Sequence, residues 1–209
     1  MKQQSDFAWT AEISLPSTAK GHYVTVIAEA QYANGEISKK TASFLYEDQQ
    51  QPIVTDKDWN NLLGNPTHTG LVEDTLVAPR LAWTTNVGSN IYMSAPVVSE
   101  GFVYVASLDE NETGKASITK IEAATGQIVW KSPLKSSVRN SIAIDGGLVF
   151  AQDVQGIVYA IDTKNGAIVW QKDLKIGVTP ALNDGLVAKD GIVYAGTGYQ
   201  LTAFKGQTG

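Results

Sequence analysis

One short segment of the sequence carries three acidic side chains that could bind a cation or a protein partner. Asp109, Glu110 and Glu112 lie within LDENETGKA, residues 108–116, which we call the acidic loop. Loops carry binding residues more often than the scaffold that positions them. A solvated hairpin tip is the competing interpretation, and it is the commoner role of such a segment.

The other residue types that perform chemistry are few. The chain has two histidines, His22 and His68, and no cysteine, so thiolate metal sites and disulfides are excluded. Five aspartates resemble a carboxylate cluster, but most adjoin glycine at repeated turns, where aspartate bonds to its own backbone: Asp145, Asp153, Asp162, Asp184 and Asp190. The sequence therefore indicates no catalytic and no cofactor-binding residue, and it identifies no metal ligand.

The composition is that of a folded chain with a mildly acidic surface. The 209 residues are 43% hydrophobic and carry a formal charge of -5, so the chain can bury a substantial core. Nucleic-acid binding depends on a basic patch, and we expect no such partner. The N-terminus as written shows no signal peptide, and no apolar run is long enough to cross a bilayer.

The acidic loop interrupts an internal repeat. KIEAATGQIVW, residues 120–130, recurs forty residues later as AIDTKNGAIVW, residues 160–170. Upstream elements of the same kind begin at Gly101, Gly147 and Gly191, and a third copy continues as LTAFKGQTG at the end of the chain. The runs are short, β-branched and bounded by glycine and aspartate, which predicts strands. The first copy carries six extra residues, and the acidic loop holds them.

Two residue types recur at fixed places in the repeat and predict how the strands turn and pack. Glycines follow threonine or asparagine in tight hairpin turns that require positive φ: Gly126, Gly166 and Gly209. Tryptophans end the strand after each turn, and we expect them to act as wedges between neighbouring sheets: Trp83, Trp130 and Trp170.

The repeat resembles that of the quinoprotein alcohol dehydrogenase-like propellers, whose pattern is Ala-x-Asp-x-x-Thr-Gly-x-x-x-Trp. The matching residues are Ala160, Asp162, Gly166 and Trp170 in one copy and Thr125, Gly126 and Trp130 in the other. Glu122, Asn165 and Lys205 depart from it. The resemblance covers about residues 59–209, opening with WNNLLGNPTHTG. It implies an all-β, incomplete β-propeller of about three to four four-stranded blades, and we expect the chain to be a fragment.

The N-terminal residues have a different pattern. Asn34-Gly35 separates two alternating runs, residues 22–32 and 36–46, and Asn-Gly in that position is a strong hairpin signal. With residues 7–16 these runs resemble part of an immunoglobulin-like or fibronectin-like module. We expect this module at 1–47, a linker at 48–58 and the propeller at 59–209. The arrangement is similar to the C-terminal region of some exported calcineurin-like metallophosphoesterases.

The leading hypothesis for function is a non-catalytic scaffold or a protein- or ligand-binding module from a larger exported protein, periplasmic or at the cell surface. Two alternatives are the non-catalytic C-terminal part of a metallophosphoesterase and a fragment of a dehydrogenase that uses pyrroloquinoline quinone (PQQ). In the latter enzymes adjacent cysteines commonly cap the quinone, and the chain has none, so we expect no cofactor. Open blade faces would favour self-association, beside a protein or cell-envelope ligand.

Overall fold

The computed structural model describes residues 2–5, 8–10, 14–16, 23–45, 58–70, 81–109, 113–176, 186–197 and 200–209. The chain divides into two compact units: residues 1–52 with 75–84 form the first, and residues 53–74 with 85–209 form the second. Each unit is treated separately below. The expected boundaries at 47 and 58 stay a prediction.

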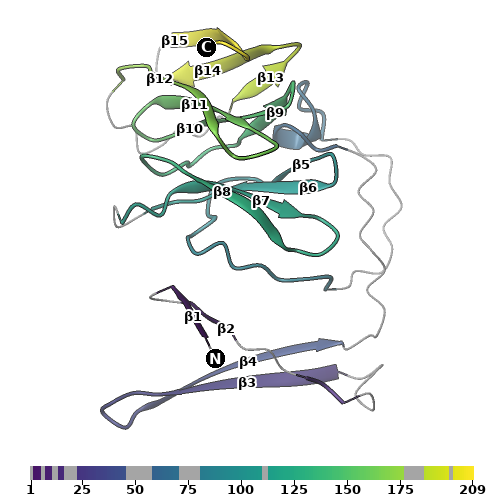
Figure 1. Cartoon of the computed structure of the whole chain (residues 1–209), viewed down its shortest axis with the longest axis vertical. Helices are drawn as coiled ribbons and strands as arrows, with labels where there is room; N and C mark the ends of the chain where they lie inside the picture. Colours follow the sequence, from purple (N-terminus) through teal and green to yellow (C-terminus); the bar gives the residue numbers. More distant parts are fainter. Residues whose placement is uncertain are drawn as a thin grey trace. The chain divides into compact units, whose positions relative to one another are not determined.

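Three antiparallel sheets make up most of the second unit, and the strands of each sheet are hydrogen-bonded in chain order. Figure 1 shows them stacked from teal through green to yellow. The first two sheets have four strands and the third has three described strands. This arrangement confirms the all-β fold and the partial propeller of repeated blades. The strands are β5 (Val97–Ser99), β6 (Phe102–Ala106), β7 (Ser117–Glu122), β8 (Ile128–Pro133), β9 (Ala143–Asp145), β10 (Leu148–Gln152), β11 (Ile157–Asp162), β12 (Ile168–Asp173), β13 (Val187–Lys189), β14 (Ile192–Thr197) and β15 (Gln200–Lys205).

The first two strands of each blade are joined by the same two-residue turn. Both turn residues have positive φ: Glu100 and Gly101 at 51° and 79°, Gly146 and Gly147 at 55° and 78°, Asp190 and Gly191 at 52° and 77°. Two positive-φ residues define the type I′ turn, whose twist matches that of the flanking strands. The turn therefore places a side chain at one edge of each blade, except where Gly146 stands.

Alternation along the strands produces two apolar cores, one on each side of the middle blade. On β11, Ile157, Tyr159 and Ile161 pack into the core shared with the first blade. Val158 and Ala160 point the opposite way, into the core shared with the third blade. Successive side chains of a strand face opposite sides of a sheet, so a strand buried on both faces has no polar alternation.

Tryptophan rings lie between neighbouring blades and bond to the next blade's turn. Trp130 Nε1 donates to the Thr163 carbonyl at 3.1 Å, and Trp170 Nε1 donates to the Gly206 carbonyl at 2.6 Å. A Cβ placed on Gly166 would lie 2.8 Å from the Trp130 ring, and one on Gly209 would lie 3.1 Å from the Trp170 ring. The turn position thus requires glycine for two reasons: its backbone has positive φ, and the tryptophan ring leaves no room for a Cβ.

The same turn glycines have φ in the left-handed region: Gly126 at 75°, Gly166 at 74° and Gly209 at 79°. Trp83 is half-buried, and its expected role as a wedge stays a prediction.

A single extended segment crosses the first strands of all three blades. Trp59 exchanges backbone hydrogen bonds with Val98 of β5, and the Asn60 carbonyl accepts from Ile144 N of β9 at 2.8 Å. The fully buried Asn61 side chain then accepts from Ala188 N of β13 at 3.1 Å and donates to its carbonyl at 3.4 Å. One residue therefore contacts each blade in turn. A one-turn 3-10 helix, η2 (Leu62–Gly64), follows.

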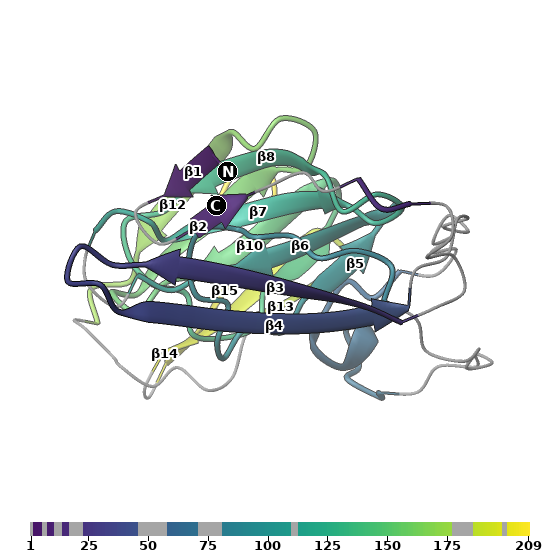
Figure 2. The same ribbon diagram turned by 90° about the horizontal axis from the view of Figure 1, so that it is seen from below.

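The first unit contains two described hairpins. β1 (Lys2–Ser5) pairs with β2 (Ala8–Thr10), and β3 (Tyr23–Gln31) pairs with β4 (Ile37–Leu45) in unbroken register. Figure 2 shows β3 and β4 as a long two-stranded ribbon. Its turn contains Gly35 with φ 85°. The immunoglobulin-like interpretation of this part stays a prediction.

Candidate functional site

The structure shows the described part of the acidic loop as a turn that the Asp109 side chain holds together. The Asp109 carboxylate accepts hydrogen bonds from Thr113 N at 2.8 Å, Thr113 Oγ1 at 2.9 Å, Gly114 N at 2.6 Å and Lys115 N at 3.0 Å. Burial raises the pKa of Asp109, but these hydrogen bonds outweigh burial and hold the pKa below its ordinary value. Asp109 therefore orders its own loop. Glu110 and Glu112 lie outside the described residues.

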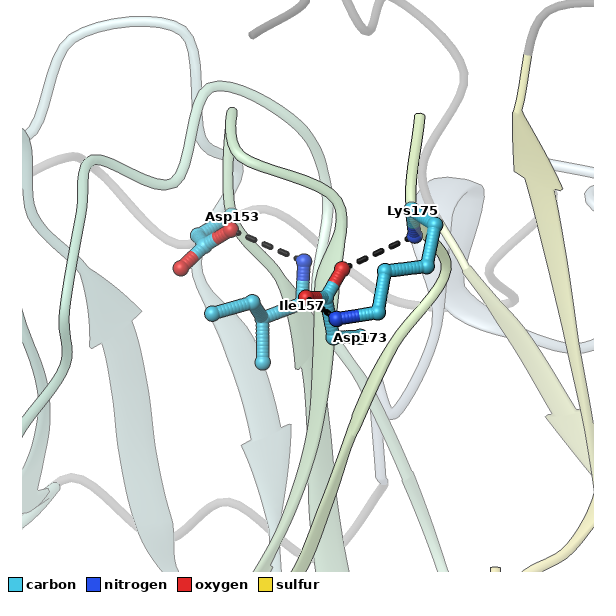
Figure 3. Close-up of polar contacts among 4 residues, drawn as sticks. All are labelled: Asp153, Ile157, Asp173 and Lys175. Atoms are coloured by element: carbon cyan, nitrogen blue, oxygen red, sulfur yellow. Dashed lines mark hydrogen bonds and ion pairs between the residues drawn. The ribbon is translucent and has the colours of Figure 1, made fainter. Parts of the chain in front are cut away.

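Other aspartates are likewise used by local structure. Buried Asp153 accepts from Gln155 N at 2.9 Å, Ile157 N at 3.0 Å and the Tyr159 hydroxyl at 2.7 Å. Asp173 accepts from the backbone N and the Nζ of Lys175 at 2.8 and 2.7 Å. Figure 3 shows the Asp153 bond to Ile157 and both Lys175 bonds. These carboxylates hold the chain reversals in which they lie.

The remaining chemistry-bearing residues are not brought together. The carboxylate of Asp162 accepts from Lys164 N at 2.6 Å within its own turn. His68 is half-buried in the 65–70 loop. His22 and Asp184 lie outside the described residues. Among the residues that the structure describes, no group of three or more histidine, aspartate or glutamate side chains could hold a metal ion.

A pocket that the sequence did not reveal lies at the edge formed by the two-residue turns. We call it the acidic pocket, and its volume is about 240 Å³. Three of its lining residues carry carboxylates, from the segment before Trp59 and from the turns of the first two blades. The lining residues are Asp58, Asn60, Ser99, Glu100, Tyr104, Ile144, Asp145, Gly146, Gly147 and Thr163.

The three carboxylates of the acidic pocket differ in how they are held. Asp58 accepts from Glu100 N at 2.9 Å and from Ser99 Oγ at 3.1 Å. Asp145 accepts from Gly191 N of the next blade at 2.7 Å. Glu100 is exposed, and its carboxylate has no hydrogen-bond partner among the described residues. Asp58 and Asp145 thus build the site, and the carboxylate of Glu100 remains available.

Tyr104 brings a hydroxyl to the same pocket. The residue is 1% exposed, and no described residue forms a hydrogen bond with the hydroxyl. Burial raises the pKa of Tyr104 to about 12, and the negative charges of Glu100 and Asp58 add to that effect. The middle blade has Phe150 at the corresponding place, which is also buried. The phenol oxygen is therefore a polar group that the packing of the repeat does not require.

A buried lysine supports the wall of the pocket. Lys120 Nζ donates to the Thr163 carbonyl at 2.8 Å and lies 3.6 Å from the centre of the Phe102 ring. Burial lowers the pKa of Lys120, while Glu100 and Asp162 oppose that effect. Ala160 occupies the corresponding position of β11. The pocket is lined by three carboxylates, and the one ammonium group near it is that of Lys120, so the site keeps an excess of negative charge.

This arrangement can bind a positively charged group, and it offers no described nucleophile paired with a base. The sequence did not reveal it because its residues come from four separate segments. Glu100 and Asp145 each adjoin a glycine turn, where an acidic residue has an ordinary structural explanation. The one available signal was Glu100 itself, since glutamate is not among the residues that favour positive φ.

The comparisons with known proteins agree on the repeat. A family model described as outer membrane protein assembly factor BamB matches residues 70–209. The BamB protein of Burkholderia pseudomallei is 32% identical over 61% of the chain and 31% of its own length. That of Salmonella typhimurium is 32% identical over 44% of the chain and 22% of its own length. The chain therefore spans less than a third of the curated relatives it matches.

Solved structures show the same fold at low sequence identity. Quinohemoprotein alcohol dehydrogenase from Comamonas testosteroni matches 75% of the chain and 26% of its own, with a TM-score of 0.60 and 21% identity. A europium-containing methanol dehydrogenase matches 73% of the chain and 31% of its own, with a TM-score of 0.56 and 17% identity. The family model covers about two thirds of the sequence, so the chain belongs to the PQQ-type repeat propellers of the outer membrane protein assembly factor BamB family.

Proposed function

We propose that the chain is a non-catalytic, protein-binding part of a β-propeller that serves outer-membrane protein assembly, as the name of its relatives describes for them. The observation that carries the proposal is the use of its carboxylates. Those of Asp109, Asp153 and Asp173 accept backbone N–H groups within their own turns, so they shape the blades.

We also propose that the protein lies in the periplasm or at the cell surface, which the outer membrane in its relatives' name supports. The described residues include no helix with the length and hydrophobicity that a membrane crossing requires. The proposed partners are proteins, with no nucleic acid among them. Neither PQQ nor phosphoesterase activity forms part of the proposal, because the likeness to quinoprotein enzymes is one of fold alone.

A second copy of the chain is also a proposed partner. Tyr194 and Leu201 are 41% and 74% exposed, and the register of β14 with β15 places them on one face of the third blade. The opposite face, with Val193 and Phe204, packs against the middle blade. In the first two blades the next blade covers the face that corresponds to the Tyr194 face of the third blade. Burial of the Tyr194 face by a second copy is therefore favoured.

Co-purification tests the proposed function. The full-length protein carrying an affinity tag is extracted from its own cells in mild detergent, and bound proteins are identified by mass spectrometry. We expect other outer membrane protein assembly factors to co-purify. Their absence, together with dye reduction on an alcohol after addition of PQQ and calcium, would overturn the proposal in favour of a dehydrogenase.

A further inference from the structure

We propose that the acidic pocket binds an arginine side chain of a partner polypeptide. This inference rests on the proposed protein-binding function and names the chemistry that one part of the surface recognises. It is carried by three observations: an excess of carboxylates, a Tyr104 hydroxyl that lines the pocket without a hydrogen bond to any described residue, and a volume suited to one side chain.

The charge of the pocket selects a cation. Asp58, Glu100 and Asp145 line it, and the nearby ammonium of Lys120 is directed to the Thr163 carbonyl. Hydrogen bonds to ionised groups are shorter and stronger than those between neutral groups. A positively charged donor that enters the pocket therefore gains most at Glu100, whose carboxylate has no hydrogen bond among the described residues.

Tyr104 points to a ligand independently of the acids. Its hydroxyl has no hydrogen bond to a described residue, and Phe150 shows that the repeat tolerates an aromatic ring without the hydroxyl. Since Tyr104 lines the pocket, its hydroxyl oxygen can accept a hydrogen bond from a bound N–H group. An aliphatic or anionic ligand would leave the phenol oxygen without that donor.

The separate acceptors of the pocket favour a guanidinium group over a metal ion or an ammonium. Within the described part of the chain the pocket acids do not form a group that could hold a metal. A guanidinium has five donors in a planar fork and can bond to several separated acceptors at once, whereas an ammonium is a compact point charge. The volume of about 240 Å³ is below the roughly 300–1,000 Å³ of sites for drug-sized ligands and suits one side chain.

The backbone at Glu100 is consistent with a selected side chain. Glu100 has φ 51°, whereas glycine occupies the same turn position in the middle blade as Gly146. Asp190 takes the same backbone angle in the third blade at 52°. The first blade therefore presents a carboxylate to the pocket from a turn position where the middle blade has no side chain.

An NMR titration tests the inference on the 209-residue chain labelled with 15N. The probe is the tripeptide acetyl-Gly-Arg-Gly-amide, compared with peptides holding citrulline or lysine and with calcium chloride. We expect saturable shifts of the Glu100, Gly146 and Gly147 amides with a Kd on the order of 1 mM, the strength of a single paired side chain. The uncharged citrulline peptide should bind about tenfold more weakly or not at all.

Variants assign the binding to named groups. Glu100→Gln should weaken binding of the arginine peptide about fivefold to tenfold, because it removes the negative charge and one acceptor oxygen. Tyr104→Phe should weaken it about threefold to fivefold, because it removes the hydroxyl acceptor. Glu100→Gln keeps the turn, since the Asp58 carboxylate bonds to the backbone N of residue 100. Asp173→Asn is the matched control: it removes an exposed carboxylate paired with Lys175, and it should leave the Kd within about twofold.

The possible results distinguish failure of the arginine pocket from failure of the proposed function. Equal or tighter binding of calcium or of the lysine peptide would overturn the arginine assignment, and so would shifts that persist unchanged in Glu100→Gln. Arginine-specific shifts without co-purifying assembly proteins would support the pocket and contradict the proposed function. Co-purification that survives Glu100→Gln, with no shift in the titration, would support the proposed function and contradict the pocket.

Discussion

Two buried tyrosines on neighbouring blades differ in whether their hydroxyl groups have a partner. Tyr159 donates to the Asp153 carboxylate at 2.7 Å and accepts from Lys135 N at 3.3 Å, and burial followed by Asp153 raises its pKa. The Tyr104 hydroxyl has no such bond among the described residues. We therefore expect the two hydroxyl groups to differ in what they contribute to stability.

Tyr159→Phe should lower the free energy of unfolding by about 1.5–3 kcal/mol, because a buried carboxylate loses a donor and Lys135 N loses its acceptor. Tyr104→Phe should leave stability unchanged or raise it by up to about 1 kcal/mol, since no bond is lost. Urea denaturation of both variants measures the difference. Equal losses would show that the Tyr104 hydroxyl has a structural partner and would remove one support for the arginine site.

At the scale of the element, the wedge and the turn of the next blade act as one unit. Gly166→Ala introduces a Cβ 2.8 Å from the Trp130 ring at a φ of 74°. Gly101→Ala introduces a Cβ at a φ of 79°, where it would contact no atom within 4 Å. Positive φ destabilises both variants, and only Gly166→Ala displaces the ring.

We expect Gly101→Ala to cost about 1–2 kcal/mol and Gly166→Ala to cost at least about 1 kcal/mol more, from overpacking of the ring. The urea midpoints of the two variants provide the comparison. If the two losses are equal, the tryptophan does not depend on the glycine and the wedge interpretation of Trp130 is wrong.

Much of each blade could be predicted from the sequence because its signals are local. Short β-branched runs between glycine turns predicted β6, β10 and β14, and the recurrence of the run ending at Trp130 predicted repeated blades. The acidic pocket could not be predicted. Its members come together only when blades pack, and Glu100 and Asp145 resemble ordinary turn residues. The contact of Asn61 with Ala188 of β13 could not be predicted either, because the two residues are 127 positions apart in the chain.

At the scale of the whole molecule, Asn61 ties the third blade to the segment that crosses the other two. Asn61→Ala should cost about 1–3 kcal/mol, because Ala188 N loses its buried acceptor. Hydrogen exchange at the Ala188 amide should accelerate by at least about tenfold. Asn165→Ala, at an exposed turn where the side chain accepts only from Ala167 N, should leave Ala188 exchange unchanged. Unchanged exchange in Asn61→Ala would contradict the role of the crossing segment.

The exposed face of the third blade predicts self-association. Light scattering at tens of micromolar should give a dimer or larger species, because apolar Leu201 and Tyr194 gain from leaving water at roughly 25 cal/mol per Å². Leu201→Glu should shift the population toward the 22.4 kDa monomer, and Val129→Glu on the outer strand β8 should not. A compact monomer of the unaltered chain would contradict this prediction.

We infer that the protein works by binding other proteins, with the acidic pocket among its recognition surfaces. The most direct measurement is photo-crosslinking in living cells, with the full-length protein carrying a photoreactive residue at position 146, which lines the pocket, or, as a control, at exposed Lys175 of the middle blade. Position 146 accepts a side chain because the corresponding turn positions hold Glu100 and Asp190 at the same backbone angle. We expect a defined crosslink from position 146 to an outer-membrane assembly protein, reduced by Glu100→Gln. Crosslinks of equal strength from both positions, or none from position 146, would contradict this expectation.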